Sequence, residues 1–127
     1  MLRGIHTLKQ DGFTLIELIS VMVIMGVMAS VSVKKFDLLT DSASNRVLAE
    51  ATKELSIREH LTWTNQKLSQ AGWLDDAGVF AQMGTDLGGD FVWTAGPDAS
   101  GGTIKFRSQS IALTRVPSTK ISAGYWK

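Results

Sequence analysis

The sequence contains no cysteine and only two prolines among its 127 residues. Without cysteine, a disulfide framework, a thiolate metal site and a cysteine nucleophile are all excluded. An excess of either charge is also missing, because the sequence has 13 Lys and Arg residues and 12 Asp and Glu residues. This balance gives no basic surface for nucleic acid or for an anionic membrane. The length allows one domain, and a hydrophobic share of 44% excludes a disordered chain.

Charge is almost absent from one long stretch. Residues 13–33 read FTLIELISVMVIMGVMASVSV, and Glu17 is their only charged residue. A helix of this length, at about 1.5 Å per residue, measures roughly 31 Å and can cross the hydrocarbon core of a membrane. The remaining chain is too short to bury a helix that is apolar on every side. A cleaved secretory signal is the main alternative, but small residues should follow it as a cleavage site, and here Lys34 and Lys35 follow.

The helical pattern continues beyond the apolar stretch. No proline or glycine lies between Val27 and Ala71. We therefore predict one long helix from residue 13 to about residue 69, whose second half packs one face on a small sheet. A membrane anchor followed by an unrelated soluble helix is the alternative. Charge pairs at helical spacing support the helix, Glu50 with Lys53 and Glu54 with Arg58. The apolar stripe expected to face the sheet comprises Phe36, Leu39, Ala43, Val47, Ala51 and Leu55, with Leu48 beside it.

The chain after residue 69 reads as loops and strands. It holds nine of the 12 glycines and both prolines. Residues 73–83 fit a short helix or an ordered loop, and residues 97–102 have turn chemistry. Strands are expected at residues 91–94, around 104–106 and from 111 until Pro117, with Tyr125 and Trp126 as a further edge. The predicted fold class is therefore α+β, a long N-terminal helix packed on a three-strand antiparallel meander. The expected inward side chains are Ile104, Phe106, Ile111 and Leu113.

The motif with chemical content lies where the polar residues 1–12, MLRGIHTLKQDG, meet the apolar stretch. It reads GFTLIE from Gly12: a glycine, an aromatic residue, and a glutamate four residues after that aromatic. Residues 1 to about 33 resemble the class III signal of type IV pilins and of the pseudopilins of type II secretion systems. The layout of a long helix followed by a sheet resembles that of these pilins and pseudopilins more loosely. This resemblance implies that a prepilin peptidase cuts between Gly12 and Phe13 and then methylates the new amine of Phe13.

Glu17 is the most informative residue of the motif. A carboxylate inside an apolar spanning helix is costly and is usually functional. One alternative is a charge near the helix end that reaches the membrane interface. The resemblance implies an assembly role, in which Glu17 of one subunit pairs with the Phe13 amine of a neighbour. Such pairing offsets the desolvation of both charges and sets the axial register of the subunits.

The resemblance also implies an organisation and a location. Residues 1–12 would be a cleaved leader, 13–33 a transmembrane and polymerisation half-helix, 34–69 a periplasmic half-helix, and 70–127 a small loop-rich antiparallel sheet. Positive charges flank the apolar stretch on both sides, so charge alone leaves the orientation open. The resemblance implies a single-pass protein of the bacterial inner membrane with its C-terminal part in the periplasm, and later a filament.

The implied function is structural. The absence of cysteine and the small soluble part favour a subunit of a type II secretion pseudopilus, with a major or minor pilin of a type IV pilus as the alternative. A monomeric single-pass membrane protein is a third interpretation. Expected partners are copies of the chain or related subunits, prepilin peptidase, an assembly ATPase and a platform protein. Lys34 stands where many relatives have a helix proline, so no proline-induced melting is expected, and Gly26 remains a candidate weak point.

Other site chemistry is poorly represented, and no enzyme activity is expected. Ser, His and Asp are present, but nothing in their spacing forms a triad. His6 lies in the leader and His60 is isolated, which argues against a zinc site. Asp86 and Asp90 are weak candidate calcium ligands because they are loop carboxylates, and turn and solvent roles explain such residues better. No other cofactor is expected, and the four tryptophans are attributed to packing.

Overall fold

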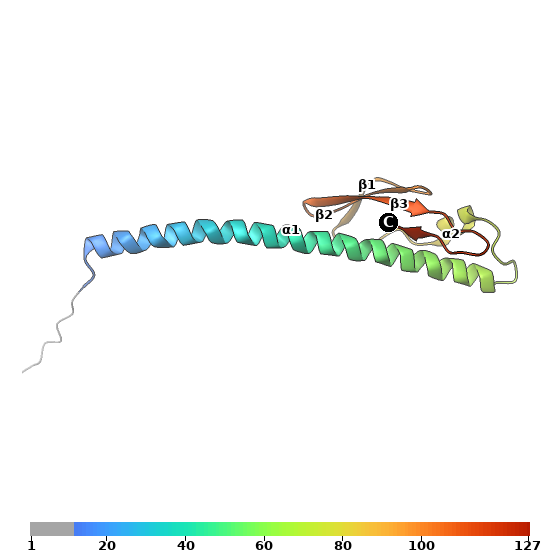
Figure 1. Ribbon diagram of the computed structural model, residues 1–127, viewed down its shortest axis with the longest axis horizontal. Helices are drawn as coiled ribbons and strands as arrows, with labels where there is room; N and C mark the ends of the chain where they lie inside the picture. The colour runs from blue at the N-terminus through green and yellow to red at the C-terminus, as the bar shows by residue number, and fades with distance from the viewer. Residues whose placement is uncertain (1–11) are drawn as a thin grey trace, which may run out of the picture. The chain divides into compact units, whose positions relative to one another are not determined.

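The computed structural model describes residues 12–127 of the chain. It consists of α1 (Leu15–Leu68), α2 (Asp76–Gln82), β1 (Phe91–Asp98), β2 (Gly101–Phe106), β3 (Gln109–Val116) and β4 (Tyr125–Trp126) (Figure 1). The strands form one antiparallel sheet in the order β1-β2-β3-β4. The predicted α+β fold is confirmed, with a long N-terminal helix packed on an antiparallel sheet. The sheet has four strands, because the C-terminal residues add β4 to the expected three.

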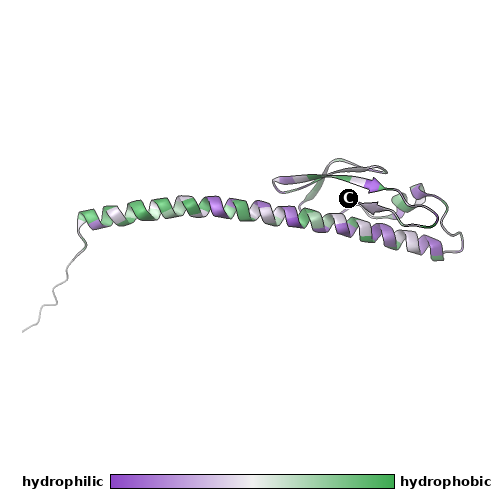
Figure 2. Ribbon diagram, viewed as in Figure 1, coloured by the Kyte–Doolittle hydropathy of each residue, from purple (hydrophilic) through white to green (hydrophobic). Residues whose placement is uncertain are grey.

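The chain divides into two compact units, residues 1–37 and 38–127. In the first unit, α1 is predominantly apolar and exposed (Figure 2). Among the described residues, α1 is a helix long and apolar enough to cross a membrane, by its length and composition. The helix is continuous through Gly26, where an added Cβ would meet nothing within 4 Å. No break in the backbone therefore marks this glycine.

In the second unit, one face of α1 packs on the sheet. The buried residues of this face are Ser44, Leu48, Ala51, Leu55 and Glu59. The predicted stripe is wrong in its first half, because Phe36 and Leu39 are 68% and 65% exposed. Burial begins only at Ser44, and the buried row is displaced by one residue from the expected positions 43 and 47. The predicted charge pairs are confirmed, with N–O distances of 2.9 Å for Lys53–Glu50 and 2.8 Å for Arg58–Glu54.

The sheet contributes the other side of this core. Ile104 and Leu113 are buried, and the half-buried Phe106 packs its ring 4.9 Å from that of Phe91. Ile111 is an exception to the prediction, since it is 38% exposed. It pairs with Ile104 and so shares its face of the sheet, but β4 reaches only Arg115 and Val116. In the described part of the chain, no further strand shields Ile111 on the outer side of β3.

The β1–β2 turn is tighter than the sequence indicated. β1 extends through Pro97 to Asp98, so only Ala99 and Ser100 connect it to β2. Asp98 Oδ1 accepts hydrogen bonds from Ser100 and from the Gly101 N–H, and these bonds hold the pKa of Asp98 below its usual value. Gly101 has a φ of +139°, and an added Cβ would lie 2.1 Å from the carbonyl oxygen of Leu113. Only glycine fits this position.

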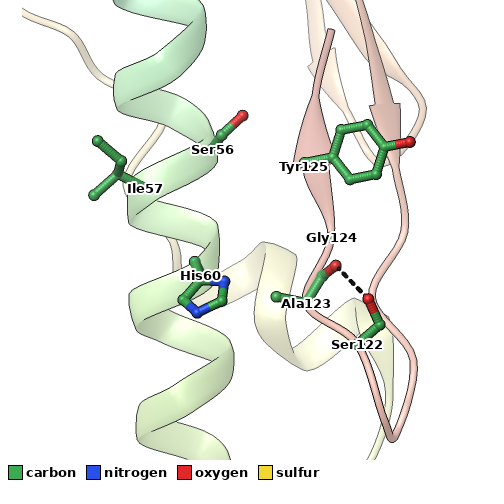
Figure 3. Close-up of a pocket in the computed structure, with 7 residues that line it drawn as sticks. All are labelled: Ser56, Ile57, His60, Ser122, Ala123, Gly124 and Tyr125. Carbon is green, nitrogen blue, oxygen red and sulfur yellow. Dashed lines mark hydrogen bonds between the residues drawn. The ribbon is translucent and has the colours of Figure 1, made fainter.

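β4 lies between β3 and α1. On one side, the backbone of Lys127 exchanges hydrogen bonds of 2.7 and 2.9 Å with Thr114. On the other side, the Ser56 hydroxyl accepts from Trp126 N at 2.9 Å and donates to Trp126 O at 3.2 Å. Figure 3 shows Ser56 projecting from α1 toward the strand that carries Tyr125. A helix side chain thus satisfies the backbone of a sheet edge that would otherwise be open.

Candidate processing and assembly site

The predicted cleavage position lies just before the first turn of α1. Gly12, Phe13 and Thr14 are exposed and precede the helix, and Phe13 is 89% exposed. A Cβ added at Gly12 would meet nothing within 4 Å, so packing inside this chain does not explain the glycine. The predicted leader up to residue 11 lies outside the described residues. Residues 12–14 are therefore an accessible peptide segment directly in front of an apolar helix.

Glu17 and Thr14 form a reciprocal cap at the start of α1. The carbonyl oxygen of Thr14 accepts the first helical bond, from Leu18 N at 3.1 Å. Thr14 Oγ1 accepts from Glu17 N at 3.3 Å, and Glu17 Oε2 accepts from Thr14 N at 3.2 Å. This arrangement is a capping box, which satisfies two backbone donors that the helix itself leaves unpaired. Glu17 therefore has a partner within its own chain as well as the inter-subunit partner expected from the resemblance.

Thr14 was not among the predicted site residues, although the sequence carries its signal. A Ser or Thr followed three residues later by Glu or Gln, just before an apolar run, is the pattern of a capping box, and Thr14-Leu15-Ile16-Glu17 matches it. The position also suits the charge of Glu17, because the first turn of a helix carries the positive end of its dipole. The same carboxylate thus stabilises the helix start and places a negative charge four residues after Phe13.

The candidate calcium ligands do not converge. Asp86 Oδ1 accepts a 2.8 Å hydrogen bond from Gly88 N, the geometry of a turn, and Asp90 lines a shallow depression that also contains Lys105 and Arg107. His60 borders a separate shallow cleft beside residues 122–125 (Figure 3). Within residues 12–127, no three His, Asp or Glu side chains gather as a metal site would require. Calcium at Asp86 and Asp90 stays a prediction.

The part of the chain that contains this site matches a known family. Residues 7–33 match the family described as the prokaryotic N-terminal methylation motif. No curated protein and no solved structure gives a significant match. The match covers the Gly12–Phe13 bond, the Thr14–Glu17 cap and the apolar helix after it, and proteins of this kind are structural rather than enzymatic. The chain therefore carries the class III signal typical of type IV pilins and pseudopilins, with a pilin-like α+β fold and an apolar helix suited to anchoring in the inner membrane before assembly.

Proposed function

We propose that the chain is a structural subunit of a type II secretion pseudopilus. A precursor anchored in the inner membrane would be cut between Gly12 and Phe13 and methylated on the Phe13 amine. The mature chain would then join copies of itself or related subunits through residues 13–33. A cytoplasmic ATPase and a membrane platform protein would drive assembly, and the growing filament would move proteins across the outer membrane.

The observation that carries this proposal is the position of Glu17 at the start of the exposed apolar helix. Cleavage at Gly12 would create an amine on Phe13, and methylation would keep that amine positive. Glu17 uses Oε2 in its own cap, and a carboxylate has two oxygens that accept hydrogen bonds. It can therefore keep the helix start intact while it pairs with the amine of a neighbouring subunit.

The apolar part of α1 supports polymerisation for a second reason. Its large apolar side chains are exposed among the described residues, so they are open to lipid or to other subunits. Lipid would surround them before assembly, and the matching helices of neighbouring subunits would do so afterwards. The lack of cysteine and the soluble part of about 90 residues favour a pseudopilus over a pilus. A type IV pilin is the alternative, and the same assembly chemistry would apply.

The test uses Glu17→Gln in the full chain. Glutamine also serves at this position of a capping box, so the variant keeps the cap and loses only the charge. We expect normal cleavage and membrane insertion, with a sharp fall in the ratio of filament-bound to membrane-bound mature protein after shearing. Gly12→Val is the processing control and should accumulate as uncut precursor. Mass spectrometry of the wild-type protein should find a chain that begins at Phe13.

Two results would contradict the proposal. An unchanged filament ratio for Glu17→Gln would leave the carboxylate as a helix cap alone. A mature wild-type chain that begins elsewhere than at Phe13 would remove the processing assignment. The system is decided separately by a deletion strain. A pseudopilus subunit should be needed for the appearance of secreted proteins in the medium, whereas a pilin should be needed for surface pili seen by electron microscopy.

A further inference from the structure

A buried group of charges joins the elements of the soluble part. The side chains of Arg115 on β3 and Glu59 on α1 are fully buried, and that of Asp76, the first residue of α2, is 24% exposed. Neither the processing motif nor the proposed assembly involves these residues. Two carboxylates and one guanidinium in the interior require strong mutual bonding, because taking each charge out of water is costly.

The hydrogen bonds of Arg115 use its whole guanidinium group. Nε and Nη2 donate to the two oxygens of Glu59, the first at 2.9 Å. Nη1 and Nη2 donate to the two oxygens of Asp76, each at 2.7 Å. Nη1 also donates to the carbonyl oxygen of Ala99 at 3.1 Å. These bonds account for all five N–H groups that a guanidinium carries, in two parallel pairs plus one single bond.

The carboxylates are satisfied by further donors. Glu59 Oε2 accepts from the indole N–H of Trp126 at 2.8 Å. Asp76 Oδ1 accepts from the N–H and the hydroxyl of Ser118, at 2.6 and 2.7 Å. Among the described residues, no buried side-chain nitrogen or oxygen lacks a partner. The cluster therefore ties α1, α2, β3, β4 and two loops together through charge-assisted bonds.

The ionisation of the group follows from these contacts. Burial raises the pKa of Asp76, but the bonds from Arg115 and Ser118 outweigh this and hold the pKa below its usual value. Burial lowers the pKa of Arg115, but its bonds to Asp76 and Glu59 raise it well above its usual value. Both groups stay charged at neutral pH.

We infer that Glu59, Asp76 and the Ala99 carbonyl form a guanidinium-binding site that the chain fills with its own Arg115, and that this site locks β4 onto α1. The arrangement selects a planar cation. Two carboxylates and a carbonyl approach the guanidinium along three directions, each matched to its N–H groups. An ammonium group has three donors on one atom, and calcium prefers six to eight oxygens. The inference concerns the folding of the soluble part and does not depend on filament assembly.

The test empties the site and offers it a free ligand. Arg115→Ala in the full chain in detergent should lower the thermal midpoint, measured by near-ultraviolet circular dichroism. Ethylguanidinium supplies the two carbons and the guanidinium that this substitution removes. At millimolar concentration it should raise the midpoint of Arg115→Ala saturably. Arg115→Met is the matched control, because its uncharged side chain fills the space. Ethylguanidinium should not raise the thermal midpoint of this variant or of the wild type.

Ligand selectivity and a second measurement complete the test. Ethylammonium should not rescue Arg115→Ala, and rescue by ethylammonium or by calcium as effectively as by ethylguanidinium would overturn the planar site. No ethylguanidinium-dependent gain of folded signal in Arg115→Ala would also overturn it. In the wild-type protein, nitrogen NMR should resolve separate, slowly exchanging guanidinium protons for Arg115 and not for the exposed Arg46. Averaged, fast-exchanging protons on Arg115 would contradict the inference without any variant.

Discussion

At the scale of single residues, Glu17 has an observed role as a helix cap and a proposed role in assembly, and substitution can separate the two. Its carboxylate caps α1 through Thr14, and its charge is the feature that assembly would use. Glutamine preserves the first role and removes the second, whereas a change at Thr14 weakens the cap and leaves the charge. The two substitutions together assign any defect to helix capping or to charge pairing.

Thr14→Ala should weaken the start of α1. Loss of an N-terminal cap costs about 0.5–2 kcal/mol, so the backbone N–H of Glu17 should exchange with solvent about 2- to 30-fold faster. Amide hydrogen exchange of the chain in detergent measures this change. Thr14→Ser keeps the hydroxyl and should leave the rate close to that of the wild type. Equal rates in all three proteins would show that the cap does not hold in solution.

Asp76 should make stability depend on acid pH. Its pKa is lowered in the folded chain from the ordinary 3.8, so the unfolded chain binds the proton first as the pH falls. The stabilising contribution of the Asp76 carboxylate is complete above pH 3.8. It is lost as the pH falls through the pKa that Asp76 has in the folded chain. Asp76→Asn should have a lower thermal midpoint at pH 7 and a flatter decline below about pH 4. The exposed Asp90→Asn should follow the wild type, and a parallel decline for Asp76→Asn would refute the assignment.

At this scale, the predicted processing and assembly residues come from a local motif. Gly12, Phe13 and Glu17 follow from a contiguous pattern, and Thr14 could have been found in the same way. The partners of Arg115 could not, because Glu59 and Asp76 lie 56 and 39 residues away in the sequence. The only local signal was the position of Arg115, a charged residue at an inward strand position two residues after the buried Leu113.

At the scale of elements, periodicity predicted the helix and the buried residues Leu48, Ala51 and Leu55, but not where the buried row begins. Apolar residues occupy two adjacent rows of α1, and the sheet covers the row that contains Leu48, Leu55 and Glu59. The polar Ser44 and Glu59 lie in that row. A prediction from hydrophobicity alone therefore chose apolar residues of the adjacent row for the first half of the stripe. The strand boundaries near Pro97 depended similarly on a turn that Asp98 organises through three hydrogen bonds.

Two leucines of α1 test the corrected face. Leu55 is fully buried, and Leu39 is 65% exposed. Leu55→Ala should lower the free energy of unfolding by about 2–5 kcal/mol, because it removes buried methyl groups and leaves a cavity. Leu39→Ala should change it by less than about 0.5 kcal/mol in detergent-solubilised monomer. Thermal unfolding of both variants measures this difference, and similar losses would restore the originally predicted stripe.

At the scale of the whole molecule, the described core lies within residues 38–127, and no residue of the apolar stretch 13–33 belongs to it. A chain starting at residue 34 should therefore be soluble and unfold in one cooperative step. Its amides in β1, β2 and β3 should be protected from hydrogen exchange, as should those of α1 from Ser44 to Glu59. Protection confined to the helix would mean that the sheet needs the N-terminal segment after all.

The proposed lock between α1 and β4 also leads us to expect an order of folding. Its hydrogen bonds join Glu59 to Arg115 and to Trp126, across 56 and 67 residues of chain, whereas β1, β2 and β3 are joined by short turns. Contacts of such long range form late, because the intervening loop must close first. A nascent chain emerging from its N-terminus can complete the hairpins early. The bond from the Trp126 indole to Glu59 can form only once the last strand has been made, so we expect the last strand to complete the fold.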